Sequence, residues 1–458
     1  MLLVNNPGRW GNVYIYPPLR HAAWNGWTPT DLIFPNFLFI VGVALVFSFS
    51  RRLDEGHSRT TLWLHVVRRA AVLILLGLFQ SRFPFYPQDT TGLGQAMAEA
   101  GSGGALLRVG LLLGFTAGVV LILGARSTRT WLIVLASGVI CGVLGQILAS
   151  PVDSRWFWQH LATARVPGVL FRIGICYLLA GSIYLRWRRP RTLVAVTSLL
   201  VVVSAVWMLW VPIPGYGCPD LDLGLWQADG EPTRLMSNWG AFIDTRIFGV
   251  RCLYTALDPG TGGLAWAFDP EGLASTPAAL ATVMMGILCG IWIHGDSGNR
   301  LPSEKRRVAG GLVAMAMLAI ASGAAFGFGL PLNKQLWTSS YAVFTAGMAL
   351  LMLAACYAML DIASWRRWAT PFIWYGRNAI LAFFLSSLLA RLLVHLKVAT
   401  TSASGVVEHL TLKTRIFESL FLSWAAPRPA SLLYALAVVL LWGAVCGLLY
   451  RKRIFIKI

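Results

Sequence analysis

Long runs of apolar residues, separated by short polar links, dominate this 458-residue chain. Stretches of about 20 predominantly apolar residues recur along its whole length, and a helix of that length crosses the hydrocarbon core of a bilayer. A transmembrane barrel would instead show short segments of alternating polarity. The pattern therefore predicts an all-α fold, a polytopic integral membrane helical bundle. Eleven complete transmembrane helices are expected, near residues 31–50, 66–83, 106–124, 131–149, 167–185, 192–212, 275–293, 308–330, 338–361, 371–395 and 430–450.

The start of the chain departs from this pattern, because three apolar residues lead directly into a polar segment at Val4-Asn5-Asn6. A cleavable signal peptide would begin with a basic segment and continue with a longer apolar one. We interpret the residues before Asn5 as the remnant of a truncated first membrane helix. Residues 1–458 are then expected to form a single transmembrane domain, with an added helical hairpin at 106–149 and a long outer loop at 213–274.

Composition and charge support a membrane protein. The chain is 57% hydrophobic and 12% charged, with a mean hydropathy of +0.65, whereas soluble proteins carry about 25% charged residues. A net charge of +19 would suggest a nucleic-acid partner in a soluble protein. Here the basic residues fall on alternate links, which is typical of links on the cytoplasmic side of a membrane. We therefore expect a lipid bilayer and no nucleic acid around the chain. The basic links contain Arg51, Arg52, Arg68, Arg69, Arg126, Arg129, Arg186, Arg188, Arg189, Lys305, Arg306, Arg307, Arg366, Arg367, Arg451, Lys452 and Arg453.

The polar and aromatic stretch Val4–Phe39 is the best candidate for chemistry, and the alternation of links places it on the outer side. A histidine such as His21 can take a proton from an amine or a hydroxyl near neutral pH, or can itself be acylated. The amide of Asn5 could donate to a developing oxyanion. Asp31 could accept the other ring proton of His21. These residues are the predicted catalytic set, suited to acyl or proton transfer.

A plainer interpretation of this stretch stays open. It could be an interfacial loop whose Trp and Tyr rings lie at the level of the lipid headgroups. Asp31 could likewise cap the N-terminus of the helix that follows it.

Four residues elsewhere could bind an anionic cosubstrate. Arg172, Arg377 and Asn378 lie inside predicted spans, where ionisable groups are costly and indicate function. An arginine offers a bidentate fork to a phosphate. Lys334 lies in a polar outer turn and could meet an anion, or could be solvated. The alternative for the arginines is an interior ion pair or a side chain that reaches the membrane surface.

The cysteines give a second expectation. Cys218 and Cys252 lie in the outer loop 213–274 and could form a disulfide in an oxidising compartment. The remaining cysteines fall inside predicted spans as small buried residues. No HExxH motif, CxxC pair or carboxylate cluster indicates a metal, so none is expected.

Several stretches resemble the heparan-α-glucosaminide N-acetyltransferase family, in the same order as in that family. The most specific is His-x-x-Trp-Asn-Gly followed by Asp-Leu-x-Phe-Pro. The matching stretches are Val4–Gly8, His21–Gly42, Arg165–Gly174, Phe268–Gly272 and Pro331–Tyr341.

The resemblance implies transfer of an acetyl group from cytosolic acetyl-CoA, the cosubstrate, to the amine of an amino sugar on the outer side of the membrane. It implies that His21 is the active-site histidine, that Asn5 assists it, that Cys218 pairs with Cys252, and that the chain self-associates as a homo-oligomer. A bacterial inner membrane, with the His21 loop on the periplasmic side, is the expected location. The chain departs from the family in its missing first-helix Arg-Gly segment, in the 106–149 hairpin and in the loose match around Arg377-Asn378.

Two other functions remain open at this point. Composition and buried arginines fit a transporter for a sugar or a lipid-linked sugar, although the corresponding Gly/Pro-broken helices of repeated halves are not seen. An O-acyltransferase would use the same histidine chemistry on a hydroxyl acceptor.

Overall fold

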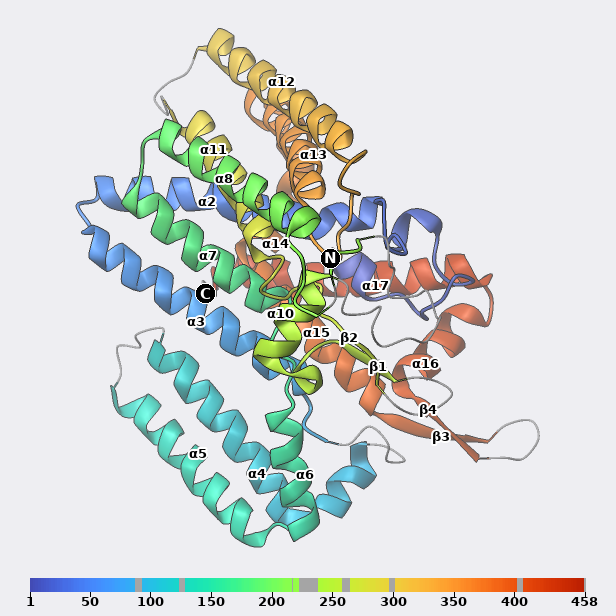
Figure 1. The fold of residues 1–458 in the computed structure, drawn as a ribbon. Coiled ribbons are helices and arrows are strands. Elements are labelled where there is room, and N and C mark those ends of the chain that lie inside the picture. Colours follow the sequence, from blue (N-terminus) through green and yellow to red (C-terminus); the bar gives the residue numbers. More distant parts are fainter. Residues whose placement is uncertain are drawn as a thin grey trace. The chain divides into compact units, whose positions relative to one another are not determined.

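The computed structural model describes residues 1–86, 93–122, 128–215, 217–221, 238–257, 264–295, 301–401 and 407–456 (Figure 1). Helices dominate these residues. Strands form two short antiparallel hairpins, one of β1 (Thr255–Leu257) with β2 (Leu264–Ala267) and one of β3 (Lys397–Thr401) with β4 (Val407–Thr411). The prediction of an all-α, polytopic membrane bundle is confirmed.

Nine helices among the described residues are long and apolar enough to cross a membrane. The tenth predicted span, 371–395, is a broken pair, because α14 (Thr370–Arg377) and α15 (Ala379–His395) meet at an angle of 70°. The span predicted at 131–149 is α5 (Thr128–Leu148), whose apolar part Ile133–Leu148 is shorter. The nine helices are α2 (Ile33–Asp54), α3 (Arg59–Arg82), α4 (Leu93–Ile122), α7 (Val169–Arg186), α8 (Pro190–Trp210), α11 (Thr276–His294), α12 (Pro302–Phe326), α13 (Ser339–Tyr357) and α17 (Pro427–Arg451).

The chain folds as two compact units. The first contains Met1–Pro17, Leu75–Ala164 and Thr370–Ile458, and the second contains Pro18–Ile74 and Arg165–Ala369. Each is described by itself below. The single-domain interpretation of the sequence stays a prediction.

In the second unit, α2 and α11 cross at very close range. A Cβ added at Gly42 of α2 would lie 2.1 Å from the carbonyl oxygen of Val283, and one added at Gly286 of α11 would lie 2.0 Å from that of Phe39. Small residues are what allow membrane helices to approach this closely. The packing extends to α12 and α13 through a core of apolar side chains that includes Phe39, Val43, Cys289, Leu312, Ala316, Ala346 and Leu350.

The basic links of this unit agree with the sequence pattern. The α2–α3 link follows Arg51 and Arg52, the α7–α8 link contains Arg188 and Arg189, and both lie at the same end of the unit (Figure 1). The polar segments that carry the candidate site lie elsewhere, before α2, before α7, before α11 and between α12 and α13.

In the first unit, α4 and α5 form the predicted added hairpin. Their contact again depends on glycine, since a Cβ at Gly110 would lie 2.5 Å from the backbone nitrogen of Gly142, and one at Gly145 would lie 2.4 Å from that of Leu107. The link that follows contains an unpredicted helix, α6 (Pro151–Ala162), capped by Ser150. Arg108 of α4 forms a bidentate pair with Asp153 of α6 at 2.8 and 2.9 Å.

Further short elements lie in links that the sequence pattern left as loops. They are α1 (Leu2–Asn5), α10 (Trp239–Phe248), α16 (Leu412–Phe417) and several single turns, among them η2 (Pro29–Leu32) and η3 (Val250–Cys252).

We expect Gly286→Val to destabilise the second unit, because the added methyl groups force α2 away from α11. Overpacking of this kind costs about 1–3 kcal/mol. The measurement is the midpoint temperature of unfolding in detergent, followed by size-exclusion chromatography after heating. Gly310→Val on α12 is the matched control, since nothing lies within 4 Å of a Cβ there. Equal midpoints for the two variants would contradict the close crossing.

Candidate active site

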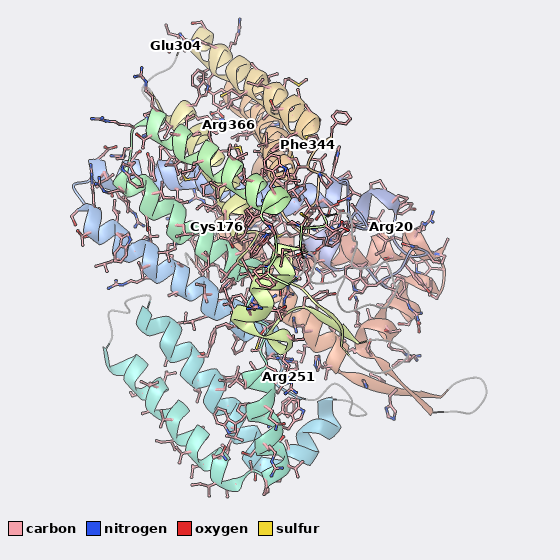
Figure 2. The ribbon with its side chains drawn as sticks, viewed as in Figure 1. Arg20, Cys176, Arg251, Glu304, Phe344 and Arg366 are labelled. Atoms are coloured by element: carbon pink, nitrogen blue, oxygen red, sulfur yellow. The ribbon has the colours of Figure 1, made fainter. Side chains whose placement is uncertain are left out.

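His21 and Asp31, both predicted from the sequence, are in direct contact in the second unit. The Nδ1 atom of His21 lies 2.6 Å from Oδ1 of Asp31. The Asp31 side chain is 1% exposed, whereas that of His21 is 42% exposed. The loop Pro18–Leu32 therefore holds the imidazole with one nitrogen turned to a buried carboxylate. Arg20, labelled in Figure 2, marks this loop.

The other oxygen of Asp31 organises the loop itself. Its Oδ2 accepts hydrogen bonds from the backbone nitrogens of Ala22 at 3.0 Å and Thr28 at 3.1 Å, and from the Thr28 hydroxyl at 3.0 Å. The bond from Thr28 N is half of a capping box at the start of η2. Asp31 is thus the third residue of η2 and bonds back to its N-cap, Thr28, rather than being the N-cap itself, and its catalytic role stays a prediction.

An ionised carboxylate only accepts hydrogen bonds, so the contact with Oδ1 suits the tautomer of His21 that carries its proton on Nδ1. In that tautomer the lone pair lies on Nε2, which Nζ of Lys334 approaches to 3.5 Å. This arrangement suits a general base that is oriented by a carboxylate.

Lys334 is the third member of this group. Its Nζ lies 3.2 Å from Oδ1 of Asp31 and 2.9 Å from Nδ1 of His21. Burial lowers the pKa of Lys334, and the carboxylates of Asp31 and Glu271 oppose that shift. Lys334 therefore pairs with a carboxylate of its own chain, while its role toward a cosubstrate stays a prediction.

The turn that carries Lys334 is tightly hydrogen-bonded. Oδ1 of Asn333 accepts from the backbone nitrogen of Leu336 at 2.9 Å, and the Thr338 hydroxyl accepts from the nitrogen of Asn333 at 3.1 Å. Nδ2 of Asn333 donates to Oδ1 of Asn25 at 3.0 Å, which joins this turn to the His21 loop. Gly26 N adds a bond of 2.7 Å to the carbonyl of Leu332.

Buried aromatic side chains lie next to the His21–Asp31 pair. The hydroxyl of Tyr341 donates to the backbone carbonyl of Asp31 at 2.6 Å. The ring of Trp337 packs edge-on against those of Tyr341 and Phe34. The guanidinium of Arg172 lies over the Trp337 ring, 5.1 Å from its centre.

Arg172 is 1% exposed and donates through Nη2 to the carbonyl of Gly272 at 2.8 Å and to the Ser275 hydroxyl. Among the described residues, its Nε and Nη1 have no hydrogen-bond partner. The predicted interior position of Arg172 is confirmed, while its role toward a cosubstrate stays a prediction.

A second charged cluster was missed from the sequence. Arg165 donates to both oxygens of Asp269 at 2.7 Å and to Oε2 of Glu271 at 2.7 Å. Burial acts against the charge of Arg165, but these carboxylates hold its pKa above the ordinary value. Burial would raise the pKa of Glu271, yet the positive charges of Arg165, Arg172 and Lys334 hold it below its usual range. Asp269 lies before α11, which begins only at Thr276.

Four of the stretches singled out in the sequence therefore meet in this unit. The His21 loop, the segment from Arg165 to Arg172, the Phe268–Gly272 turn and the Pro331–Tyr341 turn contact one another through the bonds given above. The signal that could have revealed Arg165, Asp269 and Glu271 is the placement of charged residues directly beside long apolar runs.

The remaining predicted site residues lie in the first unit. Asn5 lines a small cavity with Asn6, Phe383 and Ser386, and Met1, Leu2, Ser387 and Ala390 complete its wall. Asn378 donates to the carbonyl of Ile454 at 3.2 Å and accepts from the nitrogen of Ile456 at 3.0 Å. Arg377 lies over the ring of Phe455. Arg377 and Asn378 thus hold the C-terminal segment, and their cosubstrate role stays a prediction.

The predicted Cys218–Cys252 disulfide is not formed. Cys218 is an exposed free thiol, in a segment closed by the backbone pair Ile213–Gly217. Cys252 belongs to η3, where its carbonyl accepts from Val166 N at 3.1 Å. The backbone of Cys252 is thus bonded to Val166, and Cys218 directly follows the backbone pair Ile213–Gly217. Among the residues that the structure describes, no group of three or more His, Cys, Asp or Glu could hold a metal ion.

Comparison with known proteins agrees with the resemblance seen in the sequence. No family model matches the chain. Over 98% of its length it is 23% identical to the heparan-alpha-glucosaminide N-acetyltransferase of Homo sapiens and 23% identical to that of Mus musculus. The chain spans 57% of the length of each of these proteins. These matches show that the chain is a distant relative of the heparan-α-glucosaminide N-acetyltransferases.

Proposed function

We propose that this chain is a transmembrane acetyltransferase that uses acetyl-CoA as cosubstrate and acetylates the amine of an amino sugar. The observation that carries the proposal is the contact of the buried Asp31 carboxylate with Nδ1 of the exposed His21 imidazole. The names of the two distant relatives support both the reaction and the class of acceptor.

The reaction needs a base that first takes and then returns a proton. The amine nitrogen attacks the thioester carbonyl, a C–N bond forms, and the C–S bond breaks with its electron pair on sulfur. Nε2 of His21 takes the proton from the amine and gives it to the leaving thiolate, so the products are an amide and the free thiol. Asp31 stabilises the intermediate imidazolium through Nδ1. Base catalysis of this kind contributes about 10²–10⁴-fold to a rate.

We assign an assisting role to Asn5. Its amide is of the type that stabilises a developing oxyanion, and it lines a cavity whose other polar wall residues are Asn6, Ser386 and Ser387. Holding both reactants out of water would supply much of the remaining acceleration.

We also propose the direction of transfer. Acetyl-CoA enters from the cytoplasmic side, where the basic links attract its phosphates. The acceptor reaches His21 from the outer side, in a bacterial inner membrane from the periplasm. The positive charge of the α2–α3 and α7–α8 links supports this orientation.

We expect His21→Ala to abolish acetyl transfer from radiolabelled acetyl-CoA to glucosamine by purified protein, while the elution volume in detergent stays unchanged. His57→Ala is the matched control, because His57 is an exposed histidine in the α2–α3 link. Turnover in His21→Ala equal to that of the control would favour a transporter. Transfer to hydroxyl acceptors alone would favour an O-acyltransferase.

We expect Asp31→Asn to reduce kcat at least about 100-fold, because an amide in this position no longer holds the proton on Nδ1. The matched control is Asp54→Asn, an exposed carboxylate at the other end of the same membrane helix. Steady-state rates over a range of acceptor concentrations measure the effect. A loss confined to KM would remove Asp31 from the proton transfer.

We expect the exposed thiol of Cys218 to react with a membrane-impermeant maleimide added to intact spheroplasts. A cysteine introduced at exposed Glu304, before the basic Lys305-Arg306-Arg307 segment, should react only after lysis. Cys218→Ser measures the background from the other cysteines. The reverse pattern would invert the proposed orientation.

A further inference from the structure

The segment 454–456 is bound to the break between α14 and α15, in the first unit. Asn378, the residue at the break, is 1% exposed. Its Nδ2 donates to the carbonyl of Ile454 at 3.2 Å, and its Oδ1 accepts from the backbone nitrogen of Ile456 at 3.0 Å. One side-chain amide thus provides hydrogen-bond partners for the backbone on both sides of Phe455.

Phe455 supplies the side-chain contacts of the segment. Its ring centre lies 5.5 Å from the guanidinium of Arg377 and 5.9 Å from the ring of Tyr450, which it meets edge-on. Phe455 is half-buried, whereas Ile454 and Ile456 are each 44% exposed. A segment held by two hydrogen bonds and one half-buried ring can open locally while the rest of the protein stays folded.

A tight turn at the end of α17 directs the segment onto the break. The nitrogens of Arg453 and Ile454 donate to the carbonyls of Tyr450 and Leu449 at 3.0 and 2.9 Å, which is the Schellman pattern. That pattern needs a residue in the left-handed conformation, which is usually glycine. Here the residue is Arg453, with a φ of 55°. The contacts of the segment therefore have to offset a cost that glycine would avoid.

Asn378 has a second use that the bound segment prevents. It is the N-cap residue of α15, and asparagine is among the best residues at that position because its oxygen can accept from the first turn of the helix. The side chain makes no such bond here, and its oxygen accepts from Ile456 instead. The same oxygen can thus hold the segment or cap α15, but these two uses compete.

The helix before the break depends on contacts with its neighbours. α14 has 8 residues, and isolated helices shorter than about 12 residues are marginal. Its Trp374 and Tyr375 lie against glycines of α17, since a Cβ added at Gly447 would lie 2.9 Å from the ring of Trp374 and one at Gly443 would lie 3.2 Å from the hydroxyl of Tyr375. Arg377, the last residue of α14, contacts the ring of the bound segment.

We propose that segment 454–456 is a reversible clasp on the bent pair α14 and α15. In the closed state it covers the break at Asn378 and fixes the end of α14 against α17. In the open state the segment leaves, the amide of Asn378 caps α15, and α14 is held by its glycine contacts alone. The two states differ in the partner of one side chain, so the clasp is a conformational switch within the first unit. This inference does not depend on the proposed reaction.

Hydrogen exchange of the full chain in detergent, measured by mass spectrometry, tests the clasp. Asn378→Asp keeps the size of the side chain and can still cap α15, but it cannot donate to the carbonyl of Ile454. The amide of Ile456 should exchange about tenfold faster than in the wild type, because a broken hydrogen bond of this kind favours the open state. Equal exchange in the two proteins overturns the inference.

Two further variants separate the clasp from a general loss of stability. Arg453→Gly should slow the exchange of Ile456 about two- to fivefold, since it removes the cost of the left-handed turn. Phe455→Ala should accelerate it, whereas Phe372→Ala, which removes an exposed ring of α14, should not. The α4 and α5 peptides should be unchanged throughout. Faster exchange of those helices in both Asn378→Asp and Phe455→Ala would show unfolding of the whole unit and would also overturn the inference.

A native thiol reports on α14. Cys446 of α17 is 1% exposed and lies on the same helix face as Gly443 and Gly447, which pack against α14. Its modification by a small maleimide should be faster in Asn378→Asp than in the wild type, with Cys446→Ser as the background. If the exchange of the Ile456 amide rises while the rate of Cys446 modification does not, the proposed control of α14 is wrong.

Discussion

The burial of one carboxylate determines the arrangement around His21. Asp31 is 1% exposed, and five donors converge on its two oxygens. A buried charge without such partners would cost several kcal/mol. The donors come from the His21 loop and from the turn between α12 and α13, so satisfying this charge fixes both segments at the end of α2.

The same constraint explains why the motifs meet although they lie far apart in the chain. Arg172 sits beneath the pair and binds the Gly272 turn, and Arg165 holds the carboxylates of that turn. The aromatic ring of Trp337 separates Arg172 from the outer layer. Each buried charge needs a counter-charge or a hydrogen-bond partner. Because these residues serve as partners for one another, the motifs are held together inside an apolar helix bundle.

Much of the fold could be predicted from the sequence because the length and apolarity of a span are local properties. The His21–Asp31 contact could also be anticipated, since ten residues in one loop separate the two side chains. The partners Lys334, Arg165 and Glu271 could not be paired, because their contacts join segments 100 or more residues apart. The bend at Asn378 was missed because a break inside an apolar run leaves the average hydropathy of that run unchanged. The helix α6 was missed because a short helix does not change the average hydropathy of a polar link.

The carboxylate of Asp31 makes different contacts through its two oxygens. Here Oδ2 ties the loop to the first turn of η2, and Oδ1 aims the imidazole. The loop that orients His21 is therefore attached to α2. That helix packs closely against α11 at Gly42 and Gly286. In the proposed reaction, a base held on such a helix needs little reorganisation when charge develops.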